Sequence, residues 1–255
     1  MRKIALVTGA TAGIGTATAE ILAKNGYNLI ITGRRKDLLD NLKSELGVKY
    51  KSDVLSLNFD IRDRKQTEDT LEKLPKSWKN IDVLVNNAGL AAGLATIQEG
   101  SVDDWEQMID TNIKGLLYVT RIVAPIMVKR GSGHIINISS IAAKETYEKG
   151  NVYCATKHAV EALTKGMRID LVKHNVNVTS ISPGFVETEF ALVRFKGDKE
   201  RADKVYEGLT PLNADDVAEA VWFAVSRPPH VNINDMLIMP TAQANITTVV
   251  RKNLT

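Results

Sequence analysis

Short runs of aliphatic and β-branched residues alternate along the chain with longer stretches in which apolar residues recur every three or four positions. The short runs predict β-strands, and the longer stretches predict helices with one apolar face. The strands lack polar alternation, which is typical of a parallel sheet covered by helices on both faces. Strands are expected at residues 4–7, 28–31, 53–58, 81–85, 134–137 and 176–181, with a seventh near 237–239.

Helical spacing of apolar residues fills the intervals between these runs, and the regular alternation indicates successive βαβ units. No internal repeat, low-complexity tract or linker rich in Pro, Gly or Ser interrupts it. We therefore expect residues 1–255 to form one α/β domain with a doubly wound Rossmann fold, built on a parallel sheet of about seven strands with helices on both faces. The clearest expected helices cover residues 16–24, 36–46, 105–129 and 151–174.

The composition is that of an ordinary globular protein, with 44% hydrophobic and 25% charged residues. The 33 basic and 30 acidic side chains leave a net charge of +3, which argues against nucleic acid or an anionic membrane as a partner. A single cysteine, Cys154, excludes an internal disulfide framework and favours a reducing compartment. The apolar run at residues 4–7 is too short for a signal peptide or a membrane span, so we expect a cytoplasmic protein.

A glycine-rich turn follows the first expected strand and opens the first helix. Glycine permits a tight turn and a close backbone approach to a pyrophosphate, and the free N–H groups of a helix N-terminus attract that anion. A tight turn whose glycines only avoid steric strain is the alternative interpretation. The residues expected to contact a dinucleotide here are Gly9, Thr11, Ala12, Gly13, Ile14 and Gly15.

Two arginines, Arg34 and Arg35, follow the second expected strand, where dinucleotide-binding folds distinguish NAD from NADP. An acidic residue at this place binds the ribose hydroxyls of NAD, but the nearest acid, Asp37, is better suited to the first turn of the next helix. Two planar guanidinium groups suit the additional phosphate of NADP. A solvated basic turn is the alternative, and the neighbouring glycine-rich turn favours NADP(H) as the cofactor.

Tyr153 and Lys157 are four residues apart, so their side chains share one face of a helix. A phenol can exchange a proton with a substrate, and a nearby ammonium group would lower the phenol's pKa from its reference value of about 10. Such a pair also occurs by chance in many helices. Ser140 strengthens the catalytic interpretation, because it lies just past a strand, where its hydroxyl could hydrogen-bond a substrate carbonyl.

Together these residues resemble the short-chain dehydrogenase/reductase family over nearly the whole chain. The family's motifs occur in the family's order: the turn at residues 9–15, residues 86–89, Asn112, Ser140, the Tyr153/Lys157 pair, and Pro183-Gly184 followed by Thr188. The resemblance implies that Tyr153 is the general acid/base, that Lys157 lowers its pKa and binds the nicotinamide ribose, and that Ser140 orients the substrate carbonyl. It also implies that Asn112 holds a water molecule linking Lys157 to solvent.

The resemblance further implies a homotetramer, a segment near residues 188–210 that covers the substrate, and additional cofactor contacts. Asp60 and Ile61 would lie near the adenine, while Val186 and Thr188 would lie near the nicotinamide carboxamide. Which asparagine of the pair at residues 86–87 meets the cofactor stays open, with Asn87 favoured on the adenosine side. The additional residues placed against the cofactor are Asp60, Ile61, Asn87, Pro183, Gly184, Val186 and Thr188.

Within the family, the chain looks like the branch of NADP-dependent 3-hydroxy acid dehydrogenases that includes serine 3-dehydrogenase and L-allo-threonine dehydrogenase. Residues 108–112, 187–190, 193–198 and 229–234 carry this likeness. Arg194, near the turn that starts at Pro183, could pair with the carboxylate of L-serine, L-allo-threonine or 3-hydroxypropionate. Equally, Arg194 and Lys196 could face solvent on a mobile lid.

Other functions also stay open at this point. A sulfonate such as that of sulfoacetaldehyde would satisfy Arg194 as well as a carboxylate, whereas this arginine disfavours 3-oxoacyl thioesters. A protein that senses NADP without turnover is the alternative from another class, and the intact set of Ser140, Tyr153 and Lys157 argues against it. The 4 histidines share no ligand spacing, so no catalytic metal is expected.

Overall fold

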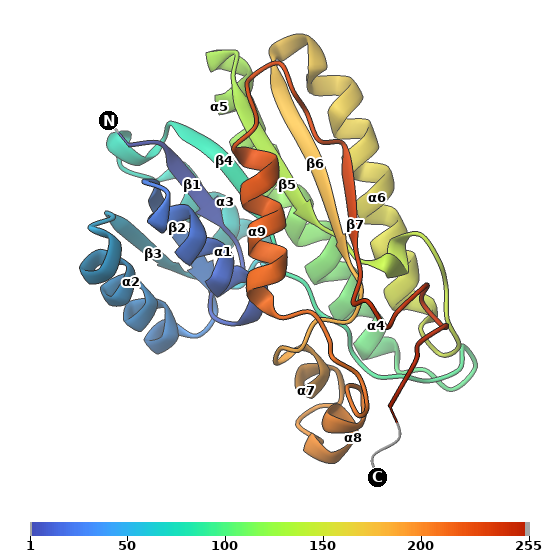
Figure 1. The fold of residues 1–255 in the computed structure, drawn as a ribbon. Coiled ribbons are helices and arrows are strands. Elements are labelled where there is room, and N and C mark those ends of the chain that lie inside the picture. Colours follow the sequence, from blue (N-terminus) through green and yellow to red (C-terminus); the bar gives the residue numbers. More distant parts are fainter. Residues whose placement is uncertain (1, 253–255) are drawn as a thin grey trace.

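A single parallel sheet runs through the computed structural model, which describes residues 2–252 (Figure 1). Its strands stand in the order β3-β2-β1-β4-β5-β6-β7, and each neighbouring pair is parallel. The order changes direction between β1 and β4, and such a switch point opens a crevice for ligands at the carboxyl ends of the strands. The strands are β1 (Ile4–Val7), β2 (Asn28–Gly33), β3 (Val54–Asn58), β4 (Ile81–Asn86), β5 (Gly133–Ile138), β6 (Val176–Pro183) and β7 (Asp235–Ile238).

Helices cover both faces of the sheet. Figure 1 shows α1, α2 and α9 on the near face and α3, α5 and α6 on the far face, while α7 and α8 lie beyond the carboxyl ends of the strands. The α-helices are α1 (Gly13–Lys24), α2 (Lys36–Tyr50), α3 (Arg64–Glu72), α4 (Val102–Ile109), α5 (Leu116–Arg130), α6 (Asn151–Leu171), α7 (Phe190–Arg194), α8 (Lys199–Lys204) and α9 (Ala214–Val225). The shorter turns are η1 (Lys76–Trp78), the π-helical η2 (Asp110–Gly115), η3 (Ile141–Ala143) and η4 (Val172–His174).

Two hydrophobic cores lie between the sheet and the helices. Successive side chains of a strand point to opposite faces, so Ala5 and Val7 pack with α1, α2 and α9. Ile4 and Leu6 pack on the other side, under α3, α5 and α6. Because both faces are buried, the strands carry the uninterrupted apolar runs seen in the sequence, and the predicted α/β architecture is confirmed.

The expected strands are all present, whereas the helices differ more from the prediction. The predicted helix at 105–129 is divided into α4, the π-helical turn η2 and α5. We did not predict α3, α7, α8 or α9, although three of them carry sequence signals: the side chains of Asp63 and Asp198 cap α3 and α8, and Asn213 with Asp216 forms a capping box for α9. Within residues 2–252, no helix is both long enough and apolar enough to span a bilayer.

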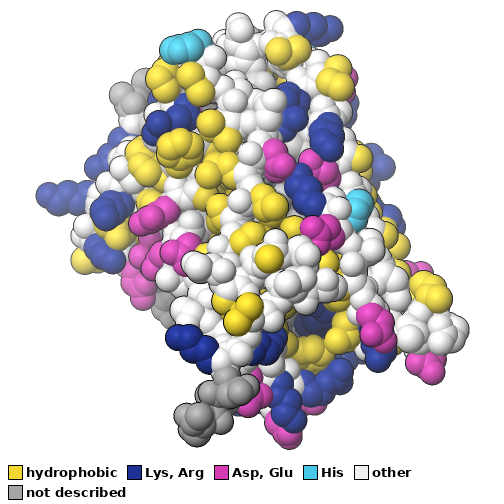
Figure 2. Space-filling model, turned by 45° about the vertical axis from the view of Figure 1, so that its right-hand side comes forward, with side chains coloured by type: hydrophobic (Ala, Val, Ile, Leu, Met, Phe, Trp, Pro, Cys, Tyr) yellow, Lys and Arg dark blue, Asp and Glu magenta, His cyan; other side chains and the backbone are white. Residues whose placement is uncertain are grey.

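Apolar side chains also gather at the surface. Figure 2 shows a band of them on the side that carries α9 and β7, interspersed with charged groups. Phe223 on α9 and Leu237 on β7 are about half exposed, at 45% and 48%. On the helices that cover the opposite face of the sheet, Leu117 of α5 and Ile169 of α6 are exposed as well.

Candidate active site

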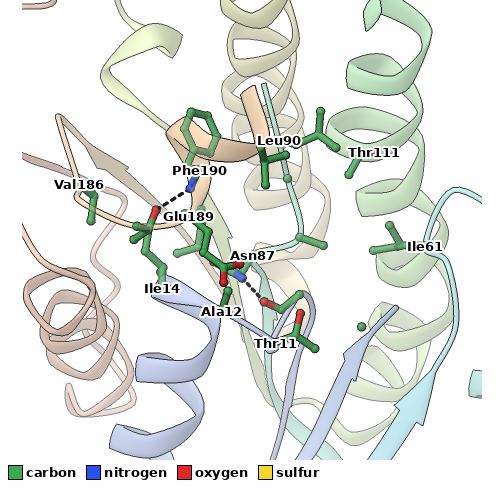
Figure 3. Close-up of a pocket in the computed structure, with 18 of the residues that line it drawn as sticks. Thr11, Ala12, Ile14, Ile61, Asn87, Leu90, Thr111, Val186, Glu189 and Phe190 are labelled. Carbon is green, nitrogen blue, oxygen red and sulfur yellow. Dashed lines mark hydrogen bonds between the residues drawn. The ribbon is translucent and has the colours of Figure 1, made fainter. Parts of the chain in front are cut away.

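The glycine-rich turn after β1 forms the floor of a pocket at the switch point of the sheet (Figure 3). Gly9 and Gly13 have φ angles of +66° and +50°, a region that side chains with a Cβ rarely occupy. The N-cap residue of α1, Ala12, offers no capping side chain, and the first turn of α1 contains no acid. The free N–H groups and the positive end of the helix dipole therefore favour an anion there.

The loop after β6 packs directly on this turn. A Cβ added to Gly13 would stand only 2.9 Å from Thr188 Cγ2. Gly15 lies beneath the turn, where an added Cβ would stand 2.2 Å from the Gly9 carbonyl oxygen. Gly15 thus permits the close approach of α1 to the turn without lining the pocket.

The two arginines after β2 both line the pocket but differ in their contacts. Arg35 Nη2 donates to the Thr11 carbonyl oxygen at 3.0 Å, and Arg35 Nη1 lies 2.9 Å from Glu189 Oε2. The guanidinium of Arg34 donates to no protein acceptor within residues 2–252. The two groups, which we expected to act alike on one phosphate, are thus in different environments.

The end of the pocket where we expected the adenine contains Asp60 and Ile61. Burial alone would raise the pKa of the Asp60 carboxyl, but hydrogen bonds from Arg62 outweigh it and hold that pKa below its usual range. Of the two asparagines, Asn87 lines the pocket, and its Nδ2 donates to the Thr8 and Gly9 carbonyl oxygens at 2.9 and 3.1 Å. Asn86 instead donates to Thr120 and Asn137 in the interior.

The residues expected to carry the chemistry meet at the opposite end of the same pocket, which contains Ser140, Tyr153 and Lys157. The ring of Tyr153 packs edge-on against Phe190 of α7, with the ring centroids 5.7 Å apart. Lys157 Nζ donates to the Ile138 carbonyl oxygen at 3.1 Å and lies 5.9 Å from the centroid of the Tyr153 ring. Ser140 begins η3, and its Oγ accepts the Ala142 N–H at 3.1 Å.

Burial controls the ionisation of the tyrosine–lysine pair. It raises the pKa of the Tyr153 phenol above its ordinary value, while Ser140 and Arg194 act in the opposite direction. Burial also lowers the pKa of the Lys157 ammonium to about 8. The lowered tyrosine pKa that we expected from the sequence is not found here, because burial of the phenol outweighs the opposing effects of Ser140 and Arg194.

Asn112 lies behind the end of the pocket that contains Tyr153 and Lys157 rather than on its wall. Its Oδ1 accepts the Leu90 N–H at 2.8 Å, and its Nδ2 donates to the Leu90 carbonyl oxygen and to Thr156 Oγ1. These contacts occupy the side chain, which sits in the π-helical turn η2. Asn112 also approaches Lys157 across Gly89, since a Cβ added to that glycine would stand 3.2 Å from Asn112 Oδ1 and 3.6 Å from Lys157 Nζ.

Arg194 lies at the end of α7 and lines a small separate cavity, of which Tyr153 is also a wall; among residues 2–252, Tyr153 alone borders both this cavity and the main pocket. Its guanidinium carbon stands 5.4 Å from the centroid of the Tyr147 ring and 5.7 Å from that of Tyr153. Two hydrogen bonds tie it to Gly93: Arg194 Nε donates to the Gly93 carbonyl oxygen at 3.1 Å, and the Gly93 N–H donates to the Arg194 carbonyl oxygen at 3.0 Å. Arg194 is therefore fixed beside the tyrosine rather than directed into solvent.

Several residues of the site were not singled out from the sequence. Tyr147, Phe190 and Glu189 reach the site from loops and from a helix of only five residues. Residues 187–190 carry only the likeness to the family branch, and nothing in the sequence assigns a site role to these three side chains. Ser139 Oγ and Thr111 Oγ1 are buried and have no hydrogen-bond partner within residues 2–252, although both residues line the pocket. Such unpaired polar atoms fit a pocket that receives a polar ligand.

The remaining predicted cofactor residues also line this pocket. They are Thr11, Ile14, Pro183, Gly184 and Val186. Residues 2–252 bring no three His, Cys, Asp or Glu side chains close enough together to hold a metal ion.

Comparisons with protein-family models and with known proteins point to the same family. Residues 3–198 match the family model described as short chain dehydrogenase. The chain is 51% identical over 242 residues to the NADP-dependent 3-hydroxy acid dehydrogenase YdfG of Salmonella typhi, which covers 94% of this chain and 96% of that protein. It is 44% identical over 239 residues to the serine 3-dehydrogenase of Agrobacterium fabrum, with 94% of each chain covered.

Solved structures show the same relationship. The closed form of a serine dehydrogenase complexed with NADP+ matches with a TM-score of 0.92 at 47% identity, covering 98% of this chain and 100% of that one. Serine dehydrogenase from Escherichia coli matches with a TM-score of 0.81 at 44% identity, covering 94% and 99%. The match to the family model, the sequence identities and the pocket with its Ser140, Tyr153 and Lys157 side chains agree: the chain belongs to the short-chain dehydrogenase/reductase family.

Proposed function

We propose that the protein is an NADP(H)-dependent dehydrogenase/reductase that interconverts a small 3-hydroxy acid and the corresponding carbonyl compound. The observation that carries the proposal is the position of Arg194, whose guanidinium carbon lies 5.4 Å from the centroid of the Tyr147 ring and 5.7 Å from that of Tyr153. A fixed cation beside the proposed acid/base suits a substrate with a carboxylate close to the reacting carbon. Relatives named as 3-hydroxy acid and serine dehydrogenases support the same substrate class.

The pocket suits NADP along its whole length. The N–H groups at the start of α1 would hold the pyrophosphate, and the unpaired guanidinium of Arg34 would bind the 2′-phosphate. Asp60 and Ile61 would border the adenine, while Val186 and Thr188 would meet the nicotinamide carboxamide at the other end. When bound, the cofactor supplies the hydride for reduction or accepts it for oxidation.

Tyr153 transfers the proton in the proposed reaction. During oxidation its phenolate removes the proton of the substrate hydroxyl, and during reduction its hydroxyl protonates the developing alkoxide. Ser140 donates a hydrogen bond to the same substrate oxygen and stabilises its charge. Because burial raises the pKa of the tyrosine, the phenolate needs the nearby positive charge of Lys157, which stays protonated at neutral pH with a pKa of about 8.

Arg194 would recognise the substrate carboxylate. Its Nε is committed to Gly93, which leaves the two Nη nitrogens for a bidentate pair with a carboxylate. Asn112, which approaches Lys157 across Gly89, would hold a water that links the Lys157 ammonium group to solvent and returns protons to it. A 3-oxoacyl thioester has no carboxylate for Arg194, whereas a sulfonate would fit it.

The test is an NADP+ reduction assay with L-serine, L-allo-threonine, 3-hydroxypropionate, 3-hydroxybutyrate and isethionate, the last of which carries a sulfonate. We expect turnover with one or more carboxylates and loss of about 10²- to 10⁴-fold in kcat for Tyr153→Phe, the usual contribution of general acid–base catalysis. A preference for isethionate would move the substrate class to sulfonates. Tight NADP binding with no turnover of any of them would reject the dehydrogenase proposal and favour a cofactor sensor.

We also infer that residues 1–255 act as one domain, with the segment near 188–210 covering the substrate, and that the protein assembles as a homotetramer. Exposed apolar side chains lie on two separate faces, one carrying Phe223 and Leu237 and the other Leu117 and Ile169. Two self-complementary faces on each chain are what a tetramer with perpendicular two-fold axes requires. Light scattering should give the mass of four 28.0 kDa chains, and Phe223→Glu should reduce it to that of a dimer.

A further inference from the structure

The segment between β6 and α7 is joined to the far side of the cofactor pocket by one ion pair. Arg35 is the N-cap residue of α2, and Glu189 is the N-cap residue of α7. Arg35 Nη1 lies 2.9 Å from Glu189 Oε2. The two residues come from opposite sides of the glycine-rich turn, so their ion pair crosses the mouth of the pocket that both residues line.

Arg35 is held in this position by the turn itself. Its Nη2 donates to the carbonyl oxygen and to Oγ1 of Thr11 at 3.0 and 3.2 Å, and its Nε donates to the same Oγ1 at 3.3 Å. Three hydrogen bonds and the ion pair would have to break before Arg35 could turn to another anion. The guanidinium of Arg34, one residue away, has no such partner within residues 2–252.

Glu189 is at first sight an unexpected residue for this place. Its side chain extends from the start of α7 toward Thr11 and Ala12 (Figure 3), where the free amides at the start of α1 favour an anion. An unpaired carboxylate would repel a phosphorylated cofactor and weaken its binding. Arg35 neutralises that carboxylate and at the same time connects the two walls of the pocket.

The segment that contains α7, which starts after Glu189, is also fixed at its C-terminal end. Arg194, at the end of α7, exchanges two hydrogen bonds with Gly93, and Lys196 Nζ lies 2.8 Å from Asp104 Oδ1. The Arg35–Glu189 pair is therefore the cofactor-side attachment of a short bridge, α7, that crosses the pocket. For the two walls of the pocket to separate at Arg35 and Glu189, this ion pair must break.

We propose that the two arginines have different tasks: Arg34 reads the 2′-phosphate and so selects NADP over NAD, whereas Arg35 pairs with Glu189 to form a clasp that slows release of either cofactor. The clasp acts on the dissociation rate because it bridges the exit from the pocket. It slows the release of NADP(H) and NAD(H) equally, since neither Arg35 nor Glu189 contacts the 2′-phosphate in this proposal. Cofactor release can be measured without substrate, so the clasp does not depend on which substrate the enzyme takes.

The experiment measures cofactor dissociation in stopped flow, following the fluorescence of bound NADPH or NADH during displacement by excess oxidised cofactor. We expect Arg35→Ala and Glu189→Gln each to increase both dissociation rates by about 2- to 5-fold, the upper part of the range for a half-exposed ion pair. The double variant should release cofactor no faster than the faster single variant, because both substitutions remove the same link. The ratio of NAD to NADP dissociation constants should change less than twofold in these variants and fall at least tenfold in Arg34→Ala.

Lys36→Ala serves as the matched control, because it removes one positive charge next to Arg35 from a side chain that pairs with Asp40 outside the pocket. It should leave both dissociation rates unchanged, and circular dichroism melting checks that every variant is folded. The clasp is overturned if Glu189→Gln leaves the dissociation rates unchanged, whatever Arg35→Ala does. The division of tasks is overturned if Arg35→Ala lowers the NADP preference as strongly as Arg34→Ala.

Discussion

Lys196 Nζ lies 2.8 Å from Asp104 Oδ1 and thereby attaches the end of the α7 segment to the first turn of α4. Asp104 is nearly buried, with 13% of its side chain exposed. It stands against Gly93, where a Cβ would be 2.8 Å from Asp104 Oδ2. Since Gly93 also holds both the backbone and the guanidinium of Arg194, the ion pair and the proposed carboxylate-binding group belong to one junction.

Breaking this ion pair is expected to displace Arg194 without touching the acid/base group. Lys196→Met should raise KM for 3-hydroxy acids by about 3- to 10-fold while changing kcat less than twofold, because the lost interaction positions the substrate. Asp104→Asn should give the same pattern, and the KM of the double variant should be no higher than that of the weaker-binding single variant. A fall in kcat at constant KM in both variants would contradict a positioning role.

Removing the guanidinium itself should have a larger and more selective effect. Arg194→Ala should raise KM for 3-hydroxy acids by about 10- to 150-fold, corresponding to loss of a charge-assisted hydrogen-bonded pair of about 1.5–3 kcal/mol. Neutral alcohols, which offer Arg194 no charge, should be affected little. Tyr147→Phe is the matched variant, because it keeps the ring beside Arg194 and removes only the hydroxyl. Equal losses for acids and neutral alcohols in Arg194→Ala would reject carboxylate recognition.

The sequence predicted the sheet well because its strands are buried on both faces, and short uninterrupted apolar runs such as the one at Leu29 to Ile31 are typical of such strands. It also located the residues of the pocket floor and of the catalytic end, since those depend on local motifs. The helix after Trp105 was predicted as continuous, because the π-helical turn inside it has no capping side chain and so leaves no boundary signal in the sequence.

The contacts that distinguish this site arise between segments far apart in the chain. Arg35 and Glu189 are separated by 154 positions, and Arg194 and Gly93 by 101. No periodicity relates such pairs, so the different environments of Arg34 and Arg35 could not be found from the sequence. The same limit applies to the pKa of Tyr153, because the neighbouring lysine was visible in the sequence whereas the degree of burial was not.

The ionisation of Lys157 should be detectable in cofactor binding. Burial lowers the pKa of its ammonium group to about 8, and an anionic cofactor favours the charged form. The affinity for NADPH, measured by nicotinamide fluorescence between pH 7 and 10, should therefore fall as pH rises through about 8. Lys157→Met should bind more weakly at pH 7 and lose this dependence. An affinity of the wild-type protein that stays constant to pH 10 would contradict the assignment.

The buried His134 in β5 should make stability depend on pH. Its Nε2 lies 2.8 Å from Thr179 Oγ1. Because the Thr179 hydroxyl donates its proton to the Ile233 carbonyl oxygen, His134 Nε2 is the donor to Thr179. Burial lowers the pKa of this imidazole to about 4. An unfolded chain would protonate the same group near its reference pKa of about 6.5.

Between these two pKa values the unfolded state binds a proton that the folded state does not, so the free energy of unfolding should fall as pH decreases from about 6.5 toward 4. The difference corresponds to about 3 kcal/mol when complete. Urea unfolding at a series of pH values should show this slope in the wild-type protein and in His230→Asn, which removes an exposed histidine. His134→Asn should be less stable at pH 7 but should have a shallower slope, and an unchanged slope in that variant would show that other groups cause the acid sensitivity.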